Sequence, residues 1–175
     1  ILVINAWVTP YFEQFGFHQL DVVITMRRAS RDIPNSVPYA FQVRPLSSTE
    51  LPAIISIDQA AFASPWHMSA DEIRQAAHMA ASVTVATLDS QVVGYQLSTL
   101  YFDGAHLARL AVLPAFQGRN VGKALMHDLV LRFAQRGVYA FTVNTQESNI
   151  QSQRVYNHFA FKRNGYDLPV YVYDV

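Results

Sequence analysis

The fold is decided by one stretch, Leu110-Ala111-Val112-Leu113-Pro114-Ala115-Phe116-Gln117-Gly118-Arg119-Asn120-Val121-Gly122-Lys123-Ala124-Leu125. An apolar strand ends at Val112, and a glycine-containing loop leads into a helix. Main-chain N–H groups at a helix N-terminus, together with the positive end of the helix dipole, bind anions. Gly118 and Gly122 let a phosphate touch the main chain, and Arg119 and Lys123 can reach outward to its oxygens. The stretch therefore predicts a pyrophosphate site.

Other interpretations of this loop must be weighed. A glycine turn that simply starts a helix occurs in many α/β proteins, and the loop alone leaves that alternative open. The run from Gly118 to Ala124 is one residue too short for a phosphate-binding Walker loop, and Ala124 stands where that loop needs Ser or Thr. The dinucleotide fingerprint G-x-G-x-x-G is absent from the sequence.

The rest of the chain predicts strands and helices on both sides of the loop. Ser47 with Glu50, and Ser69 with Glu72, are spaced as capping boxes that open two helices. Alternation and helical periodicity predict the following order: strand 39–44, a helix that follows Ser47 and runs to Ala61, a helix that follows Ser69 and ends near Met79, strands 82–88, 91–100 and 105–112, helix 121–136, strand 138–143, helix 148–158 and strand 170–175. This order predicts an α/β (α+β) fold, with helices packed on a mixed sheet.

Composition excludes several classes of function. The chain has 175 residues, 51% of them hydrophobic and 15% charged, as in an ordinary globular protein. Thirteen basic residues balance thirteen acidic ones, so no overall field attracts nucleic acid or an anionic membrane. There is no cysteine to act as a nucleophile or zinc ligand, and the histidines show no metal-ligand spacing. We expect a cytoplasmic protein without a metal, and, because the chain does not begin with Met, a piece of a longer one.

Two blocks of the sequence resemble the GNAT superfamily of acyl-CoA N-acyltransferases. Residues 110–125 resemble its acyl-CoA-binding motif, Q/R-x-x-G-x-G/A after a strand and V-x-P. Residues 149–161, from Asn149 through Tyr156 to Phe161, resemble its later N…Y…GF signature. Asn120 replaces the first motif glycine, and asparagine is the other residue that best tolerates a left-handed conformation. Ala160 replaces the glycine of the second block.

The resemblance implies a fold, a cosubstrate and a reaction. The fold would be a mixed, mostly antiparallel central sheet flanked by helices, and the cosubstrate would be acetyl-CoA. An amine would attack the thioester directly, without a covalent enzyme intermediate. Tyr156 would be the catalytic residue that protonates the leaving thiolate, as a phenol can. The implied cofactor-binding residues are Leu110, Ala111, Val112, Gln117, Gly118, Arg119, Asn120, Val121, Gly122, Lys123, Asn149 and Tyr156.

Within the superfamily, the chain is most similar to the ribosomal-protein alanine N-acetyltransferases. Residues 57–66 resemble their substrate-side segment, in which Pro65 and Trp66 either shape the acceptor pocket or only pack over a loop. The acceptor would be a small amine or a protein N-terminus. That group uses a glutamate to act on the amine, but the matching residue here is the neutral Asn144. A water relay to His106, Asp103 or Glu147 is one alternative; surface or structural roles for all three are another.

Because Asn144 replaces the glutamate of that group, a second class of function stays open. The domain would then bind acyl-CoA without catalysis, as a sensor or as a structural partner. A generic α/β module that does not bind CoA is the third alternative.

The N-terminal segment contains an internal repeat of the second block. The two segments that resemble each other are Phe12-Glu13-Gln14-Phe15-Gly16-Phe17 and Tyr156-Asn157-His158-Phe159-Ala160-Phe161. An apolar strand, 20–26, follows the first of them. We expect residues 1–29 to be the tail of a preceding GNAT domain, 30–38 a linker and 39–175 the acetyltransferase domain. The exposed strand needs a partner. We expect it to pack against the sheet of the acetyltransferase domain or against the sheet of a second chain, and a homodimer and a contact with a preceding GNAT domain are the partners left open.

Overall fold

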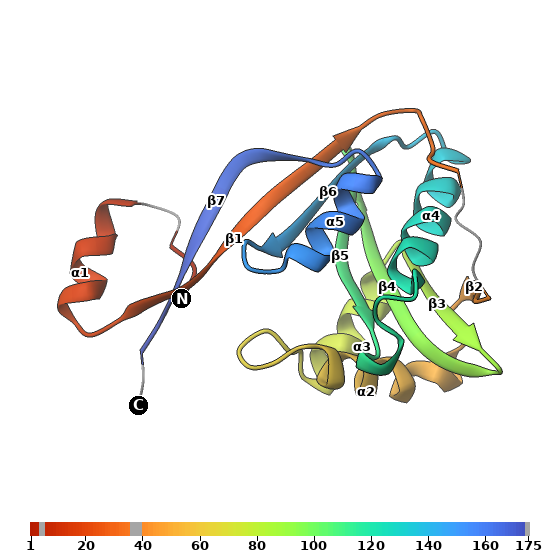
Figure 1. The fold of residues 1–175 in the computed structure, drawn as a ribbon, viewed down its shortest axis with the longest axis horizontal. Coiled ribbons are helices and arrows are strands. Elements are labelled where there is room, and N and C mark those ends of the chain that lie inside the picture. Colours follow the sequence, from red (N-terminus) through yellow and green to blue (C-terminus); the bar gives the residue numbers. More distant parts are fainter. Residues whose placement is uncertain (4–5, 36–39, 174–175) are drawn as a thin grey trace. The chain divides into compact units, whose positions relative to one another are not determined.

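The chain divides into two compact units, which are described in turn. The computed structural model describes residues 1–3, 6–35 and 40–173 (Figure 1). One unit comprises Ala29–Phe141, and the other comprises Ile1–Arg28 together with Thr142–Val175.

The unit of residues 29–141 is built on an antiparallel sheet. Its strands lie in the order β2 (Gln42–Pro45), β3 (Ser82–Leu88), β4 (Gln91–Tyr101) and β5 (Gly104–Val112). The predicted tight turn between β3 and β4 is confirmed, because Asp89 and Ser90 both have positive φ, 47° and 68°. That pair of angles matches the right-handed twist of a hairpin.

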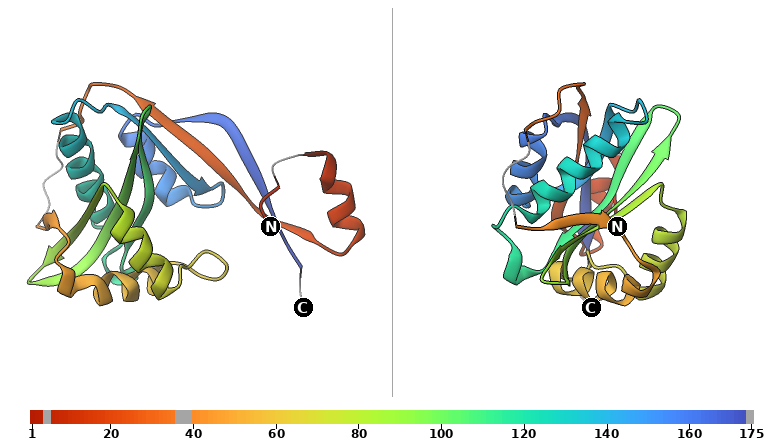
Figure 2. Two further views of the ribbon diagram at one scale, coloured as in Figure 1. Left: turned by 180° about the vertical axis from the view of Figure 1, so that it is seen from behind. Right: turned by 90° about the vertical axis from the view of Figure 1, so that its right-hand side faces the viewer.

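Helices cover both faces of this sheet (Figures 1 and 2). On one face α2 (Leu51–Ala61) and α3 (Ala70–Met79) bury an apolar cluster that includes Ile54, Ile73, Val85 and Tyr95. On the other face α4 (Val121–Ala134) buries Val121 and Leu125 against Ala86 and Val93. Neighbouring residues such as Val85 and Ala86 belong to opposite clusters, because side chains alternate along a strand.

The predicted capping boxes start the helices of this unit. Ser47 and Glu50 cap the short 3-10 helix η2 (Ser48–Glu50) that leads into α2. Ser69 accepts a hydrogen bond from the Glu72 N–H, and the Glu72 carboxylate accepts one from the Ser69 N–H, at the start of α3. Both helix starts are therefore encoded by local side-chain chemistry.

The other unit contains β7 (Lys162–Val172) and most of β1 (His18–Ala29) and of β6 (Ala140–Gln146), in the order β6-β1-β7. The helices α1 (Thr9–Gln14) and α5 (Ile150–His158) immediately precede β1 and β7. β1 pairs with β7 in antiparallel fashion, from His18 opposite Val172 to Arg27 opposite Lys162. The apolar N-terminal strand thus has a partner, and the helices and mostly antiparallel strands confirm the expected fold class.

Several boundaries were wrong. The last strand begins at Lys162, not at Val170. Its first residues are polar and exposed, and Gly165 has φ 86°, so the segment reads as a turn in the sequence. β6 spans Ala140–Gln146 in place of 138–143. Residues 30–35 of the expected linker lie in no helix or strand, and its residues 36–38 lie outside the described ranges, as do Tyr39 and residues 174–175.

Ala160 provides a test of local strain. It has φ 61°, a conformation that costs a residue with a Cβ about 1–2 kcal/mol. Its side chain is exposed, so glycine would lose no packing. We expect Ala160→Gly to raise the free energy of unfolding by about 1 kcal/mol, less the entropy that glycine adds to the unfolded chain. Urea denaturation measures the change. The reverse substitution Gly16→Ala, at φ 82°, is the control and should destabilise; a destabilised Ala160→Gly would refute the strain.

Candidate functional site

The predicted phosphate loop lies between β5 and α4. After Val112 the chain forms the 3-10 helix η3 (Pro114–Phe116), and Gln117 continues in extended conformation. Asn120 is the N-cap of α4 and has φ 65° and ψ 11°, in the left-handed region. Asparagine thus adopts the conformation for which the motif elsewhere uses glycine.

The main-chain N–H groups of this loop are available to a ligand. Within residues 1–3, 6–35 and 40–173, none of the N–H groups of Gly118, Arg119, Asn120 and Val121 donates to a protein carbonyl. All of these residues except Val121 are exposed. A Cβ built on Gly118 would meet no atom within 4 Å. Since the first N–H groups of a helix have no partner inside it, this end of α4 presents a set of donors to solvent.

Gly94 sets the position of this helix end over the sheet. A Cβ at Gly94 would lie 2.9 Å from the carbonyl oxygen of Ala111 and 3.0 Å from Cγ1 of Val121. Any larger residue would push the first turn of α4 away from β4. The close approach of helix and sheet therefore fixes the donor groups in space.

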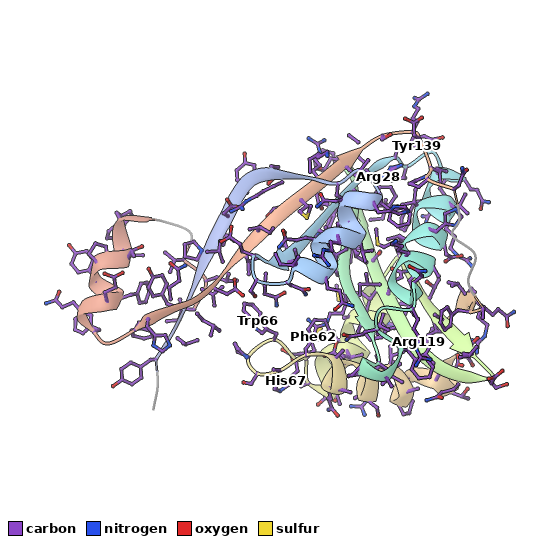
Figure 3. The ribbon with its side chains drawn as sticks, viewed as in Figure 1. Arg28, Phe62, Trp66, His67, Arg119 and Tyr139 are labelled. Atoms are coloured by element: carbon purple, nitrogen blue, oxygen red, sulfur yellow. The ribbon has the colours of Figure 1, made fainter. Side chains whose placement is uncertain are left out.

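The side chains of Arg119, Lys123 and Gln117 have different environments at the loop. The Arg119 guanidinium lies 5.4 Å from the centre of the Phe116 ring, and Figure 3 shows Arg119 at the loop. Lys123 is half-buried in the first turn of α4. The Gln117 side-chain amide donates to the carbonyl oxygen of Val112 at 3.2 Å. A pantetheine arm pairing at Val112 would have to share that carbonyl.

The second sequence block lies in the other unit, on α5. Asn149 is the N-cap of α5, and its side-chain oxygen accepts a hydrogen bond from the Ser152 N–H at 3.0 Å. Tyr156 is buried, and its ring centre lies 5.9 Å from that of Phe161. Asn149 therefore has a structural role of its own. The cofactor-contacting roles of Asn149 and Tyr156 stay predictions.

The same unit contains two of the residues considered for the proton acceptor. The side-chain oxygen of Asn144 accepts a hydrogen bond from the Thr25 hydroxyl at 3.0 Å. Glu147 pairs with Arg163 at 2.7 Å. Sequence reasoning missed Asp21 of β1, whose carboxylate accepts hydrogen bonds from the Ser148 side chain and from the Val22 N–H. No sequence signal linked Asp21 to Ser148, because their proximity depends on the position of β1 in the sheet.

The remaining two candidates belong to the unit of residues 29–141. Asp103 is exposed in the turn between β4 and β5. His106 is half-buried on β5, and burial lowers its pKa below the usual value. His106 is therefore neutral near pH 7, since burial disfavours the imidazolium.

Sequence reasoning also missed a buried ion pair beside residues 57–66. Asp58 of α2 is fully buried and accepts hydrogen bonds from Arg109 Nε at 2.6 Å and Nη2 at 2.8 Å, and from the Tyr95 hydroxyl at 2.6 Å. Arg109 also donates to the Trp66 carbonyl oxygen, and the Met68 N–H donates to Asp58. The pair thus holds the loop that follows α2, where Figure 3 shows Phe62, Trp66 and His67.

Two opposing effects determine the charge of Asp58. Burial removes water from the carboxylate and would raise its pKa, but the hydrogen bonds from Arg109, from the Met68 N–H and from Tyr95 outweigh burial and hold the pKa below its usual value. Burial, and the hydrogen bond to Asp58, raise the pKa of Tyr95, which stays a donor. The Arg109 guanidinium also lies 3.6 Å from the centre of the Phe62 ring. These groups form a satisfied ionic network.

Two further properties concern metals and membranes. Across the described ranges, no group of three or more His, Cys, Asp and Glu side chains is arranged to hold a metal ion. No helix in that part of the chain is long and apolar enough to cross a membrane.

Comparison with known proteins defines the class of this chain. The sequence profile of the acetyltransferase (GNAT) family matches residues 51–161, which include the loop before α4 and all of α5. The chain belongs to this family, and its class is that of the N-acetyltransferases. A curated relative is the ribosomal protein bS18-alanine N-acetyltransferase of Salmonella typhimurium, 29% identical over 116 residues, which are 66% of this chain and 77% of that protein.

Solved structures share the fold. A GCN5-related N-acetyltransferase from Sphaerobacter thermophilus superimposes with a TM-score of 0.76 at 14% identity; the match covers 97% of this chain but only 57% of that one. The PaiA N-acetyltransferase of Thermoplasma acidophilum, solved in complex with coenzyme A, has a TM-score of 0.61 at 16% identity, over 77% of this chain and 99% of that one. The likeness to the Sphaerobacter structure extends over nearly the whole chain.

Proposed function

We propose that this chain transfers an acetyl group from acetyl-CoA to the α-amine at the N-terminus of a protein or peptide. The observation that carries the proposal is the row of N–H groups from Gly118 to Val121 at the start of α4, which suits the pyrophosphate of CoA. Arg119 and Lys123 add positive charge to this end of the helix.

The choice of acceptor rests on the missing carboxylate. The residue at the position of the subfamily's glutamate is Asn144, which is neutral and already accepts a hydrogen bond from Thr25. An α-amine, with a pKa of about 8, is partly neutral at pH 7, whereas a lysine amine at about 10.4 needs a base. The proposed acceptor is therefore an α-amine, in agreement with the ribosomal protein alanine named for the Salmonella relative.

The proposed reaction is direct. The amine nitrogen attacks the carbonyl carbon of the thioester, the carbon–sulfur bond breaks, and an amide forms. The departing thiolate takes a proton from the Tyr156 hydroxyl. The nitrogen that has formed the new bond loses its extra proton to solvent, and the Tyr156 phenolate regains a proton from solvent. Asn149, beside its capping role, is proposed to contact the pantetheine arm, as are the main-chain groups of Leu110, Ala111 and Val112.

A panel of acceptors tests the function. Thiol release from acetyl-CoA is measured with peptides that have a free N-terminal alanine, with the same peptides blocked at the N-terminus, and with blocked peptides that contain lysine. We expect release only with the free α-amine. Saturable binding of acetyl-CoA without turnover for any amine would favour a non-catalytic acyl-CoA-binding domain. A chain that does not bind acetyl-CoA would contradict both functions.

The loop has a separate test. Gly122 is in the first turn of α4, where a branched side chain would keep phosphate from the main chain. We expect Gly122→Val to weaken acetyl-CoA binding by about 2 kcal/mol or more, through steric exclusion and lost hydrogen bonds. Calorimetry on the folded variant measures it. His127→Val, farther along α4, is the control and should bind normally. Unchanged affinity in Gly122→Val would contradict the loop assignment.

A further inference from the structure

An aromatic surface is exposed on the segment that contains α1. Trp7, Tyr11 and Phe15 are 70%, 57% and 69% exposed. With Val8, Phe12 and Phe17 they line an almost wholly apolar hollow of about 370 Å³. Contiguous apolar surface of this kind marks a site of interaction. We call these six residues the aromatic surface.

The segment that carries this surface repeats a segment at the other end of the chain. After α1, the N–H groups of Phe15 and Phe17 donate to the Phe12 carbonyl, and the N–H of Gly16 donates to the Glu13 carbonyl. The same bonds occur after α5. The N–H groups of Phe159 and Phe161 donate to the Tyr156 carbonyl, and the N–H of Ala160 donates to the Asn157 carbonyl. Gly16 and Ala160 both have positive φ, 82° and 61°. The repeat seen in the sequence is therefore also a repeat of main-chain hydrogen bonding.

Ring contacts and strand pairing extend the repeat. Phe12 and Phe17 have ring centres 5.2 Å apart, and the equivalent rings of Tyr156 and Phe161 are 5.9 Å apart. The strands that follow, β1 and β7, pair with each other. When Phe12 is aligned with Tyr156, Val23 and Ile24 of β1 are equivalent to Asp167 and Leu168 of β7. In the sheet, Val23 pairs with Leu168 and Ile24 pairs with Asp167. The pairing is thus centred on equivalent positions, as expected for two copies related by an approximate two-fold axis.

The two copies differ in burial. Phe159 is 2% exposed, whereas its equivalent Phe15 is 69% exposed. Phe161 is also buried, whereas its equivalent Phe17 is half-buried. The second copy therefore has packing that the first copy lacks. A protein surface like the one that covers Phe159 in the second copy would also bury Phe15 in the first copy.

We propose that the aromatic surface is covered by a preceding domain of the acetyltransferase fold, carried on the same polypeptide before Ile1. Residues 1–29 would then be the last helix and strand of that domain, and β1 with β7 would join the two domains through their equivalent strands. The Sphaerobacter match covers 97% of this chain, including the N-terminal segment, but only 57% of that one, so a chain of this fold can carry a further long stretch. The inference concerns assembly and is independent of the acetyl transfer proposed above.

Cysteine labelling tests the proposal, because residues 1–175 contain no cysteine. Phe15→Cys and Tyr11→Cys report on the aromatic surface, and Glu13→Cys, exposed on the same helix and outside the hollow, is the matched control. Each variant is prepared in the full-length product of the gene and in the 175-residue chain. The labelling rate at each site is then measured by peptide mass spectrometry, which separates it from any other cysteine.

We expect labelling at positions 11 and 15 to be at least tenfold slower in the full-length product than in the 175-residue chain, with equal rates at position 13. Equal rates at positions 11 and 15 in the two proteins would overturn the proposal. So would a gene product that has no domain before Ile1. Protection in the 175-residue chain alone, accompanied by dimer formation, would overturn it in favour of a second copy of the chain.

Discussion

Asp58→Asn is expected to lower the free energy of unfolding by about 3 kcal/mol, near the lower limit for breaking a buried ion pair. The substitution keeps the shape of the side chain but removes the charge opposite Arg109, whose side chain is only 15% exposed. The guanidinium would then be buried without its counter-charge, a cost that the remaining hydrogen bonds cannot offset. Urea or thermal denaturation measures the change. A loss below about 1 kcal/mol would mean that the pair contributes no more than a surface contact.

Two further variants separate the buried charge from other effects. Asp71→Asn breaks the exposed pair between Asp71 and Arg74, and it should cost a small fraction of the loss at Asp58. The double variant Asp58→Leu with Arg109→Met contains neither buried charge, so it should be less destabilised than Asp58→Leu alone. If the double variant is the weaker protein, lost packing rather than unpaired charge is the cause.

The same pair predicts a dependence on pH. The pKa of Asp58 is lower in the folded chain than its usual value of about 3.9. The stability from its ionised form is therefore fully present above about pH 5 and is lost as the pH falls through the folded-state pKa. The difference in stability between the parent chain and Asp58→Asn should be constant from pH 5 to 7 and should shrink in acid. A difference that grows in acid would refute the direction of the shift.

The elements with strong local signals could be predicted from the sequence. The capping boxes at Ser47 and Ser69, the turn at Asp89 and the start of α4 at Val121 depend on neighbouring residues, and the structure confirms them. The first half of β7 could not be predicted, since its residues are polar and exposed and only pairing with β1 makes them a strand.

The network around Asp58 was missed although it leaves a sequence signal. Asp58 lies on the apolar face of α2, one turn after Ile54. Arg109 lies at two-residue spacing along β5 with Ala105, Leu107 and Ala111, which are all buried. A charged residue on each of two buried faces predicts that the two side chains pair. In contrast, the contacts of Asp21 and Thr25 had no such signal, because they depend on where β1 enters the sheet.

Tyr156→Phe is expected to lower turnover by roughly 10²-fold while the affinity for acetyl-CoA stays similar. The ring of Tyr156 is buried beside Phe161, and phenylalanine keeps that packing, so only the hydroxyl is lost. Without it, the thiolate of CoA would have to leave unprotonated, which slows breakage of the carbon–sulfur bond. The measurement is kcat with a free α-amine acceptor, together with calorimetric binding of acetyl-CoA.

The control makes the same chemical change on the surface of the same unit. Tyr166, on β7, is 74% exposed, and Tyr166→Phe should leave both kcat and affinity unchanged. If the kcat of Tyr156→Phe equals that of the parent chain, Tyr156 has a packing role only. Equal losses of turnover and of acetyl-CoA affinity would assign the hydroxyl to binding of the cosubstrate. A loss of kcat alone, with normal unfolding free energy, is the pattern expected of a proton donor to the leaving group, because such a donor acts after the cosubstrate is bound.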